Sequence, residues 1–281
     1  MRTVLDRHVV VDGVRIAYAD SGEGSPIVLI HGTPSHSYIW RDVIPGLKRA
    51  GHRVLAFDLL GYGLSERPPD RDTSVASQAR MLERLLDTWQ IDRAGIVGHD
   101  IGGATAMIFA TRIPHRILKL ALIDTVSYDS WPSETWQKII RERLNEYERM
   151  PMEEFREMMT RQLRMTVHDK ERMSREVLEA YLEPLVTELG KPSFFVHQVR
   201  HYDSRYTEEI ADDLKGLTIP VKILWGEEDE WQPVSYAKRL RDDIPNATLT
   251  VVARAGHFLM EEAPERVTTE LAGFFRKETV E

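Results

Sequence analysis

Short apolar segments alternate with longer amphipathic segments along the first half of this 281-residue chain. The apolar segments hold four to seven residues, are rich in Val, Ile and Leu, and end at Gly, Pro or Asp, which is typical of strands. They cover residues 14–20, 27–30, 53–58, 94–98 and 118–124. Apolar residues at three- and four-residue spacing predict helices, and they occur in residues 38–50, 74–90 and 103–113. Continuously apolar strands favour a parallel sheet buried on both faces, so the pattern predicts an α/β fold.

The alternation stops after residue 125 and returns near residue 214. The intervening segment contains no convincing strand, is rich in Met, and is divided by several prolines into what we expect to be helices. Strand-like segments return at 221–225 and 247–252, and a last helix is predicted at 263–276. The chain is therefore expected to consist of a first part of an α/β core (1–125), a helical cap (126–213) and a second part of the core (214–281).

Composition limits the partners and the chemistry of this chain. It has 37 basic and 45 acidic residues, and the net charge of −8 opposes binding to nucleic acid. No apolar run approaches the roughly 18 residues that span a bilayer, and the first residues lack a signal-peptide pattern, so we expect a cytoplasmic protein without a membrane partner. The absence of Cys excludes disulfides and thiolate chemistry. His197 and His201 are four residues apart without a third ligand nearby, so no metal site is expected.

The segment Gly98-His99-Asp100-Ile101-Gly102 lies between a predicted strand and a predicted helix. A turn of the form Gly-x-nucleophile-x-Gly lifts its central residue above the sheet and directs it to the N-terminus of the next helix, where the helix dipole favours negative charge. Small flanking residues are needed because the bend is sharp. Asp100 at the centre could therefore be a nucleophile, or only the capping residue of a glycine-rich turn.

Two further chemically active residues follow predicted strands. Asp229 comes after the strand 221–225, and His257 follows the strand 247–252. The carboxyl ends of parallel strands meet at the ligand crevice of an open sheet, so Asp100, Asp229 and His257 are expected to converge there. This pattern predicts a catalytic triad in the chain order nucleophile, acid, histidine.

These motifs resemble the α/β-hydrolase superfamily over nearly the whole chain. The segment His31-Gly32-Thr33-Pro34 is similar to the oxyanion loop of that family, residues 58–65 are similar to a later loop, and the helical insertion lies where the family carries its cap. With Asp as the nucleophile, the resemblance narrows to haloalkane dehalogenases and epoxide hydrolases. Residues 31–41, and less specifically 128–132, look most like the dehalogenases.

The resemblance implies a two-step hydrolysis without a cofactor. An aspartate side chain ionises with a pKa of about 3.9 in water, so it can attack a carbon bearing a halide or an epoxide oxygen without help from a base. The resulting ester of Asp100 would be hydrolysed by a water that His257 activates, with Asp229 orienting the imidazole. Backbone N–H groups of Ile101 and Thr33 would hold the oxyanion. Some haloalkane dehalogenases place the acid after the sixth strand instead, which makes Asp124 the alternative acid.

Two positions depart from the pattern of these families. Both families usually have Trp after the nucleophile, and its indole N–H helps to bind the leaving halide in dehalogenases. This chain has Ile101, which has no side-chain donor, and it has Thr33 where dehalogenases often have Asn.

Aromatic residues of the cap, together with His31, are the candidates for the substrate pocket. Epoxide hydrolases protonate the opening oxygen with cap tyrosines, and a cap Trp could replace the missing halide donor or only pack between cap and core. The candidates are His31, Trp131, Trp136, Tyr147, Tyr181, Tyr202 and Tyr206.

The sequence thus predicts a monomeric or homodimeric hydrolase that uses water to cleave a small or medium apolar electrophile through an Asp100 ester. Haloalkane dehalogenation is the first candidate reaction, and epoxide hydrolysis by the same three residues is the second. An ester or lactone hydrolase, or a non-catalytic ligand receptor on the same fold, remains open.

Overall fold

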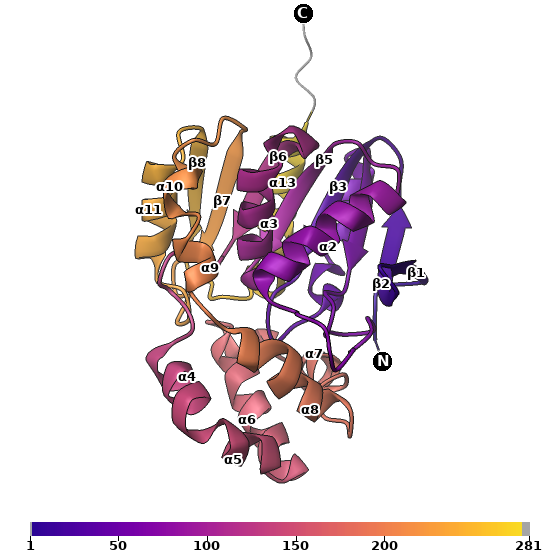
Figure 1. The fold of residues 1–281 in the computed structure, drawn as a ribbon. Coiled ribbons are helices and arrows are strands. Elements are labelled where there is room, and N and C mark those ends of the chain that lie inside the picture. Colours follow the sequence, from indigo (N-terminus) through magenta and orange to yellow (C-terminus); the bar gives the residue numbers. More distant parts are fainter. Residues whose placement is uncertain (1, 277–281) are drawn as a thin grey trace, which may run out of the picture.

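A computed structural model describes residues 2–276, and its centre is an eight-stranded sheet (Figure 1). The strand order is β1-β2-β4-β3-β5-β6-β7-β8. β2 pairs antiparallel with β1 and β4, and the other neighbouring pairs are parallel, so the predicted α/β class with a mostly parallel sheet is confirmed. The strands are β1 (Arg7–Val11), β2 (Val14–Ser21), β3 (Ser25–Ile30), β4 (His52–Phe57), β5 (Ala94–His99), β6 (Ile117–Ile123), β7 (Val221–Gly226) and β8 (Ala247–Val252).

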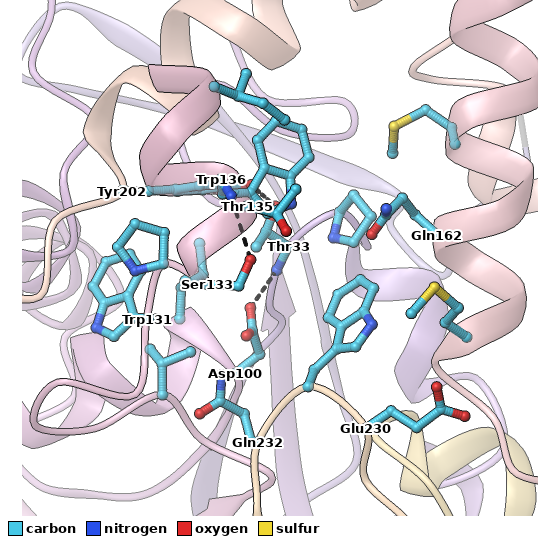
Figure 2. Close-up of a pocket in the computed structure, with 18 of the residues that line it drawn as sticks. Thr33, Asp100, Trp131, Ser133, Thr135, Trp136, Gln162, Tyr202, Glu230 and Gln232 are labelled. Carbon is cyan, nitrogen blue, oxygen red and sulfur yellow. Dashed lines mark hydrogen bonds between the residues drawn. The ribbon is translucent and has the colours of Figure 1, made fainter. Parts of the chain in front are cut away.

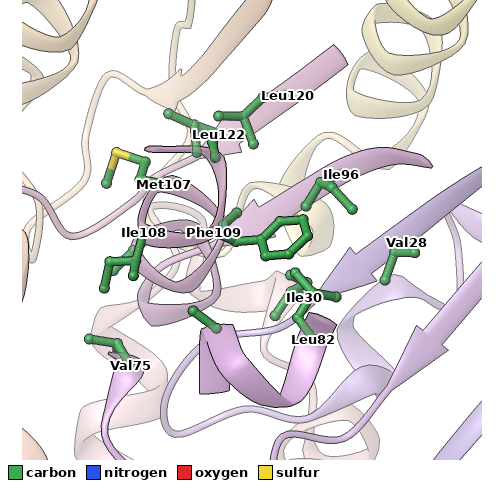
Figure 3. Packing of buried hydrophobic residues seen from close by; sticks show 14 of the residues in the cluster. Val28, Ile30, Val75, Leu82, Ile96, Met107, Ile108, Phe109, Leu120 and Leu122 are labelled. Atoms are coloured by element: carbon green, nitrogen blue, oxygen red, sulfur yellow. The ribbon is translucent and has the colours of Figure 1, made fainter. Parts of the chain in front are cut away.

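Helices cover both faces of the sheet and bury an apolar cluster on each face. Alternate residues of β3 show the two layers: Val28 and Ile30 belong to one cluster, and Ile27 and Leu29 belong to the other. Figure 3 shows the first cluster, where Phe109 of α3 lies among side chains from the strands. The helices of this face are α2 (Val75–Thr88), α3 (Ile101–Arg112) and α11 (Val234–Asp243), and those of the other face are α1 (Ile44–Arg49), α12 (Leu259–Glu262) and α13 (Pro264–Phe275).

The segment predicted as one helix over residues 38–50 forms two shorter pieces instead. A 3₁₀ turn covers Ser37–Trp40, and α1 begins only at Ile44. Pro45 lies in the first turn of α1, where its missing N–H costs no helical hydrogen bond, whereas a single helix running through it would lose one. The prediction of one continuous helix was therefore wrong.

The insertion between β6 and β7 consists of helices joined by turns and loops, and its described residues contain no strand. Figure 1 shows its first helices lying across the edge of the sheet where the parallel strands end. Phe155, Phe194 and Phe195 are buried at its centre, and their cluster continues into the core below. These helices are α4 (Glu134–Lys138), α5 (Leu144–Arg149), α6 (Met152–Met165), α7 (Arg175–Leu182) and α8 (Gly190–Ser193), with π-helical turns at Ile139–Arg143 and Phe194–Gln198 and 3₁₀ turns at Lys170–Arg172 and Val199–His201.

The last two helices of the predicted cap range lie beside the sheet. α9 (Arg205–Glu208) and α10 (Ala211–Leu214) both pack against α3, and Ile210 and Leu214 belong to its apolar cluster. The helices that lie over the strand ends therefore stop before Arg205. Residues 277–281 of the predicted second core part lie outside the described residues.

One buried carboxylate ties the cap to the core. Glu261 of α12 is 6% exposed and accepts two hydrogen bonds from Arg41, each 2.6 Å long. The hydroxyl of Tyr181, on the cap helix α7, donates to the same carboxylate. The guanidinium of Arg41 lies over the ring of Tyr38, 4.2 Å from its centroid. These contacts neutralise a charge that would otherwise be costly in the interior.

Replacing Arg41 by Leu should therefore destabilise the fold, because it leaves the Glu261 carboxylate buried without a cation. We expect the free energy of unfolding, measured by urea denaturation, to fall by about 3 kcal/mol. The matched control is Arg80→Leu, which removes an exposed cation 3.4 Å from Asp72 and should cost less than about 1 kcal/mol. Equal losses in the two variants would show that burial of Glu261 does not matter.

Candidate active site

Asp100 occupies the sharp turn between β5 and α3. Its φ of 52° and ψ of −121° lie in a region that residues other than Gly rarely adopt. The turn brings backbone atoms very close: a Cβ atom on Gly98 would lie 2.4 Å from the Gly102 carbonyl oxygen, and one on Gly102 would lie 2.4 Å from the His31 carbonyl oxygen. Glycine is thus required on both sides of Asp100, which explains the Gly-x-Asp-x-Gly spacing.

The carboxylate of Asp100 is held by the loop that follows β3. Its Oδ1 accepts a 2.7 Å hydrogen bond from the backbone N–H of Thr33 (Figure 2). Its Oδ2 lies 3.6 Å from Nε2 of His257. The predicted oxyanion groups therefore lie beside Asp100, since Thr33 contacts its carboxylate and Ile101 is the first residue of α3.

The structure brings His257 and Asp229 together as expected. His257 is fully buried, and its Nδ1 lies 2.8 Å from Oδ2 of Asp229. The other oxygen of Asp229 accepts hydrogen bonds from the backbone N–H groups of Trp231 (2.8 Å) and Gln232 (2.9 Å). Nδ1 of His257 therefore donates to a fixed carboxylate, and its Nε2 faces Asp100. The catalytic roles assigned to these residues remain predictions.

Charge, more than burial, controls the protonation of His257. Burial alone would lower its pKa, because it disfavours the imidazolium ion. The negative charges and hydrogen bonds of Asp229 and Asp100 outweigh that effect and raise the pKa of His257 well above its usual value. The imidazole is therefore held as a cation while both carboxylates are ionised.

Asp124, the alternative acid, lies near the same group but is bonded differently. Its Oδ1 accepts a 2.7 Å hydrogen bond from the N–H of Gly226, and its Oδ2 is buried without a partner. Burial, with a further contribution from the charge of Asp229, raises the pKa of Asp124 well above its usual value. The geometry thus favours Asp229 as the partner of His257, and burial favours the protonated form of Asp124 beside it.

Two residues that the sequence analysis did not assign to the site enclose the imidazole of His257. The ring of Trp231 lies 5.0 Å away and the ring of His99 lies 4.8 Å away, both measured between centroids. His99 donates from Nε2 to the carbonyl oxygen of His257 at 3.0 Å, and burial lowers the pKa of His99 to about 3. The sequence could have indicated both residues, because His99 directly precedes Asp100 and Trp231 follows shortly after Asp229.

A cavity of about 420 Å³ lies between the cap and the strand ends, and Asp100 and Ile101 form part of its wall. Most of its lining side chains are apolar, with Met158, Met159 and Met165 of α6 among them. A lining of this kind suits an apolar small molecule, because Met side chains adapt to different shapes.

The predicted pocket residues divide into two groups. Trp131, Trp136, Tyr147 and Tyr202 line the cavity together with Thr33. His31, Tyr181 and Tyr206 lie outside the lining of this cavity.

Each of the three excluded residues is bonded elsewhere. Nδ1 of His31 donates to the Gly32 carbonyl oxygen (2.8 Å), and its Nε2 accepts from the N–H of Leu59 (3.0 Å). Tyr181 donates to the buried carboxylate described above. Tyr206 accepts a 2.8 Å hydrogen bond from Arg205 at the surface.

Tyr202 is the cap tyrosine that the contacts link to Asp100. Its hydroxyl lies 2.6 Å from Oγ1 of Thr33, the residue whose N–H binds Asp100. Oγ1 of Thr33 also donates to Oε1 of Gln198 at 3.1 Å. Gln198 was not predicted, because a single polar residue in a helical segment gives no sequence signal.

Trp131, by contrast, donates its indole N–H to Thr207 at 2.9 Å.

In the part of the chain that the structure describes, no three or more His, Asp, Glu or Cys side chains are arranged so that they could hold a metal ion. Both ring nitrogens of His197 are engaged, by Ser193 and by the carbonyl oxygen of Pro68. Among residues 2–276, no helix combines the length and the apolar character that crossing a bilayer requires.

Comparison with known families matches residues 25–264 to a family model described as alpha/beta hydrolase fold. The chain is similar over 96% of its length to a 2-hydroxy-6-oxononadienedioate/2-hydroxy-6-oxononatrienedioate hydrolase of Burkholderia vietnamiensis, at 28% identity and 94% of that protein. It is also 29% identical to haloalkane dehalogenase 2 of Mycobacterium tuberculosis, over 92% of this chain and 90% of that protein.

Solved structures give the same fold. An alpha/beta hydrolase fold protein from Burkholderia ambifaria matches with a TM-score of 0.89 and 33% identity, covering 96% of this chain and 97% of that one. The epoxide hydrolase CorEH matches with a TM-score of 0.80 and 25% identity, again covering 96% and 97%. The expected superfamily and fold are therefore confirmed, and the relatives perform several different reactions.

The raised pKa of His257 should depend on Asp229. Replacing Asp229 by Asn removes one of the two anions, so the pKa of His257 should fall, which can be measured by NMR titration of the imidazole signal. A pKa that is raised on folding stabilises the fold below the unfolded value of about 6.5 and ceases to do so as the pH rises through the raised value. Asp229→Asn should therefore destabilise the protein more at pH 6 than at pH 10.

The control for this titration is Asp242→Asn, which removes an exposed carboxylate paired with Arg241. It should leave the His257 signal unchanged. An unchanged His257 titration in Asp229→Asn would contradict the electrostatic explanation.

Proposed function

Because the chain belongs to the α/β-hydrolase-fold family, we propose that it is a hydrolase that opens an epoxide with water through a covalent ester on Asp100. The observation that carries this choice is the placement of the Tyr202 phenol beside Thr33, which binds the nucleophile. An epoxide oxygen needs a proton as its bond to carbon breaks, and a phenol in the cavity wall can supply it.

In the first step, Oδ2 of Asp100 attacks an epoxide carbon. Oδ1 is engaged by the N–H of Thr33, which leaves Oδ2 as the attacking oxygen. A C–O bond forms to Oδ2, the C–O bond of the ring breaks, and the ring oxygen takes the proton of Tyr202. The product is an ester of Asp100 whose carbonyl oxygen is the former Oδ1, already bonded to a backbone donor.

In the second step, water attacks the carbonyl carbon of the ester. Ester formation removes the charge of Asp100, one of the two anions that raise the pKa of His257, so the imidazolium can release its proton and become a base. His257 then takes a proton from the water, while Asp229 holds the ring and stabilises the new cation. Of the two protons of water, one ends on the diol and the other stays on His257, which is thereby restored as the imidazolium. The proton that the imidazolium released earlier restores the phenol of Tyr202.

Haloalkane dehalogenation is the second candidate, supported by the 29% identity to haloalkane dehalogenase 2 and by the residues that follow β3. A leaving halide needs N–H donors, but the side chain of Ile101 has none and the indole of Trp131 is bonded to Thr207. Trp136 is the other indole of the predicted set that lines the cavity. Because the donor set is weaker than in the family pattern, the epoxide reaction stands first here although the sequence favoured the dehalogenase.

A His257→Ala variant should trap the ester, because it lacks the base of the second step. Incubation with 1,2-epoxyhexane should add the whole mass of the epoxide, measured as intact protein mass, whereas 1-bromohexane would add only a hexyl group. Asp100→Ala in the same background should prevent either adduct. A folded His257→Ala protein that forms no adduct with a broad panel of electrophiles would contradict the ester mechanism and favour an ester hydrolase or a receptor.

Tyr202→Phe tests the choice of leaving group. In the His257→Ala background it should slow the formation of the epoxide adduct by about 100- to 1,000-fold, because the phenolic proton is lost. The matched control is Tyr206→Phe, which removes a hydroxyl at the surface and should leave the rate unchanged. An unchanged rate in Tyr202→Phe, or a haloalkane that reacts much faster than any epoxide, would favour the dehalogenase.

A further inference from the structure

We propose that the hydroxyl of Thr33 is a positioning group for the acid of the reaction: it accepts the Tyr202 hydrogen bond before ring opening and donates to the phenolate oxygen afterwards. This inference rests on the proposed epoxide reaction and extends it to a residue whose side chain had no role there.

Thr33 Oγ1 lies between two oxygens, and the buried phenol of Tyr62 also interacts with the Thr33 side chain. The Tyr202 hydroxyl is 2.6 Å away on one side, and Oε1 of Gln198 is 3.1 Å away on the other. Oε1 of an amide only accepts hydrogen bonds, whereas a hydroxyl can donate one and accept others. While the hydroxyl of Thr33 donates to Gln198, its lone pairs face Tyr202, so the Tyr202 O–H points to Thr33. The phenol is thereby held in one orientation.

Proton transfer changes the acceptor to which the Thr33 hydroxyl donates most strongly. When an epoxide binds, the Tyr202 O–H turns from Thr33 to the ring oxygen. Once Tyr202 has given its proton to the opening epoxide oxygen, its own oxygen becomes an anion that accepts strong hydrogen bonds. Rotation about the Cβ–Oγ1 bond of Thr33 moves its hydrogen from Gln198 to that anion, and no proton leaves Thr33. When a proton later returns to Tyr202, the Thr33 hydroxyl rotates back to Gln198. This alternation of the Thr33 hydrogen bond between Gln198 and Tyr202, which we call the relay, is thereby restored in each turnover.

The position of Thr33 couples this relay to the nucleophile. The backbone N–H of Thr33 donates to Oδ1 of Asp100, and its side chain contacts Tyr202. Gln198, which is 3% exposed, fixes the other end of the relay inside the cap. One residue of the core thus sets the positions of both the group that attacks carbon and the group that protonates oxygen.

The groups that shift the pKa of the Tyr202 phenol explain why a hydrogen-bond donor to the phenolate oxygen is needed. Burial raises the pKa of the Tyr202 phenol, the Thr33 hydrogen bond acts in the opposite direction, and the charge of Asp100 raises the pKa further. Ester formation removes the Asp100 charge as the phenolate forms. Of these three influences on the pKa of Tyr202, the Thr33 hydrogen bond is the one that favours the phenolate. The Thr33 hydroxyl should therefore have its largest effect on the rate of ring opening.

The test compares Thr33→Val and Thr33→Ser in the His257→Ala background with 1,2-epoxyhexane. Val keeps the branched shape and the backbone N–H of Thr33 but removes the hydroxyl, so ester formation should slow by about 10- to 100-fold. Ser restores the hydroxyl and should bring the rate back to within about threefold. In the background that retains His257, the rate of ester hydrolysis should be equal for Thr and Val, because that step does not use the phenol.

A second measurement separates this electrostatic role from packing. Incorporation of a difluorotyrosine at position 202 supplies a more acidic phenol, which depends less on a stabilising donor. The slowing caused by Thr33→Val should therefore shrink in the fluorinated protein. A loss that is the same with either tyrosine, or that Ser does not rescue, would overturn the relay and leave Thr33 a structural residue.

Failure of the proposed function gives a different result from failure of the relay. If His257→Ala with native Thr33 forms no epoxide adduct, both ideas are wrong. If it forms the adduct and Thr33→Val forms it equally fast, epoxide opening stands and the relay alone is wrong.

Discussion

The close backbone packing around Asp100 is the constraint on which the site depends. Gly98 and Gly102 allow β5 to turn directly into α3, and Asp100 is held at a positive φ that costs on the order of 1–3 kcal/mol. The fully buried strand β5 and the buried residues 101–110 of α3 offset that cost. Because the turn fixes the carboxylate above the sheet, the loop after β3 can bind one of its oxygens and His257 can face the other.

The fold and the three central residues were predictable because each depends on local patterns. Continuously apolar strands indicated the parallel sheet, and Asp100, Asp229 and His257 stand just beyond strand ends that meet at one edge. A single rule about where parallel strands end was therefore enough to bring together residues that lie up to 157 positions apart in the chain.

The remaining errors arise where long-range packing decides. β1 is an edge strand whose residues are mostly exposed, so it lacks the apolar run that marked the other strands. α11 is rich in charged residues and shows few apolar positions. Among the cap tyrosines, helical spacing does not distinguish Tyr202 in the cavity wall from Tyr181 on a buried carboxylate, because that choice depends on how the cap helices pack on the core.

The division of the site between two distant parts of the chain has a consequence for protein synthesis. Asp100 and Thr33 precede the cap, whereas Asp229 and His257 follow it. A ribosome that has completed the first part of the core has made Asp100 and its backbone donor, but neither His257 nor its partner Asp229. The machinery that would regenerate Asp100 is thus assembled last. Under the proposed mechanism, an Asp100 ester formed before the later strands dock would persist until His257 and Asp229 are in place.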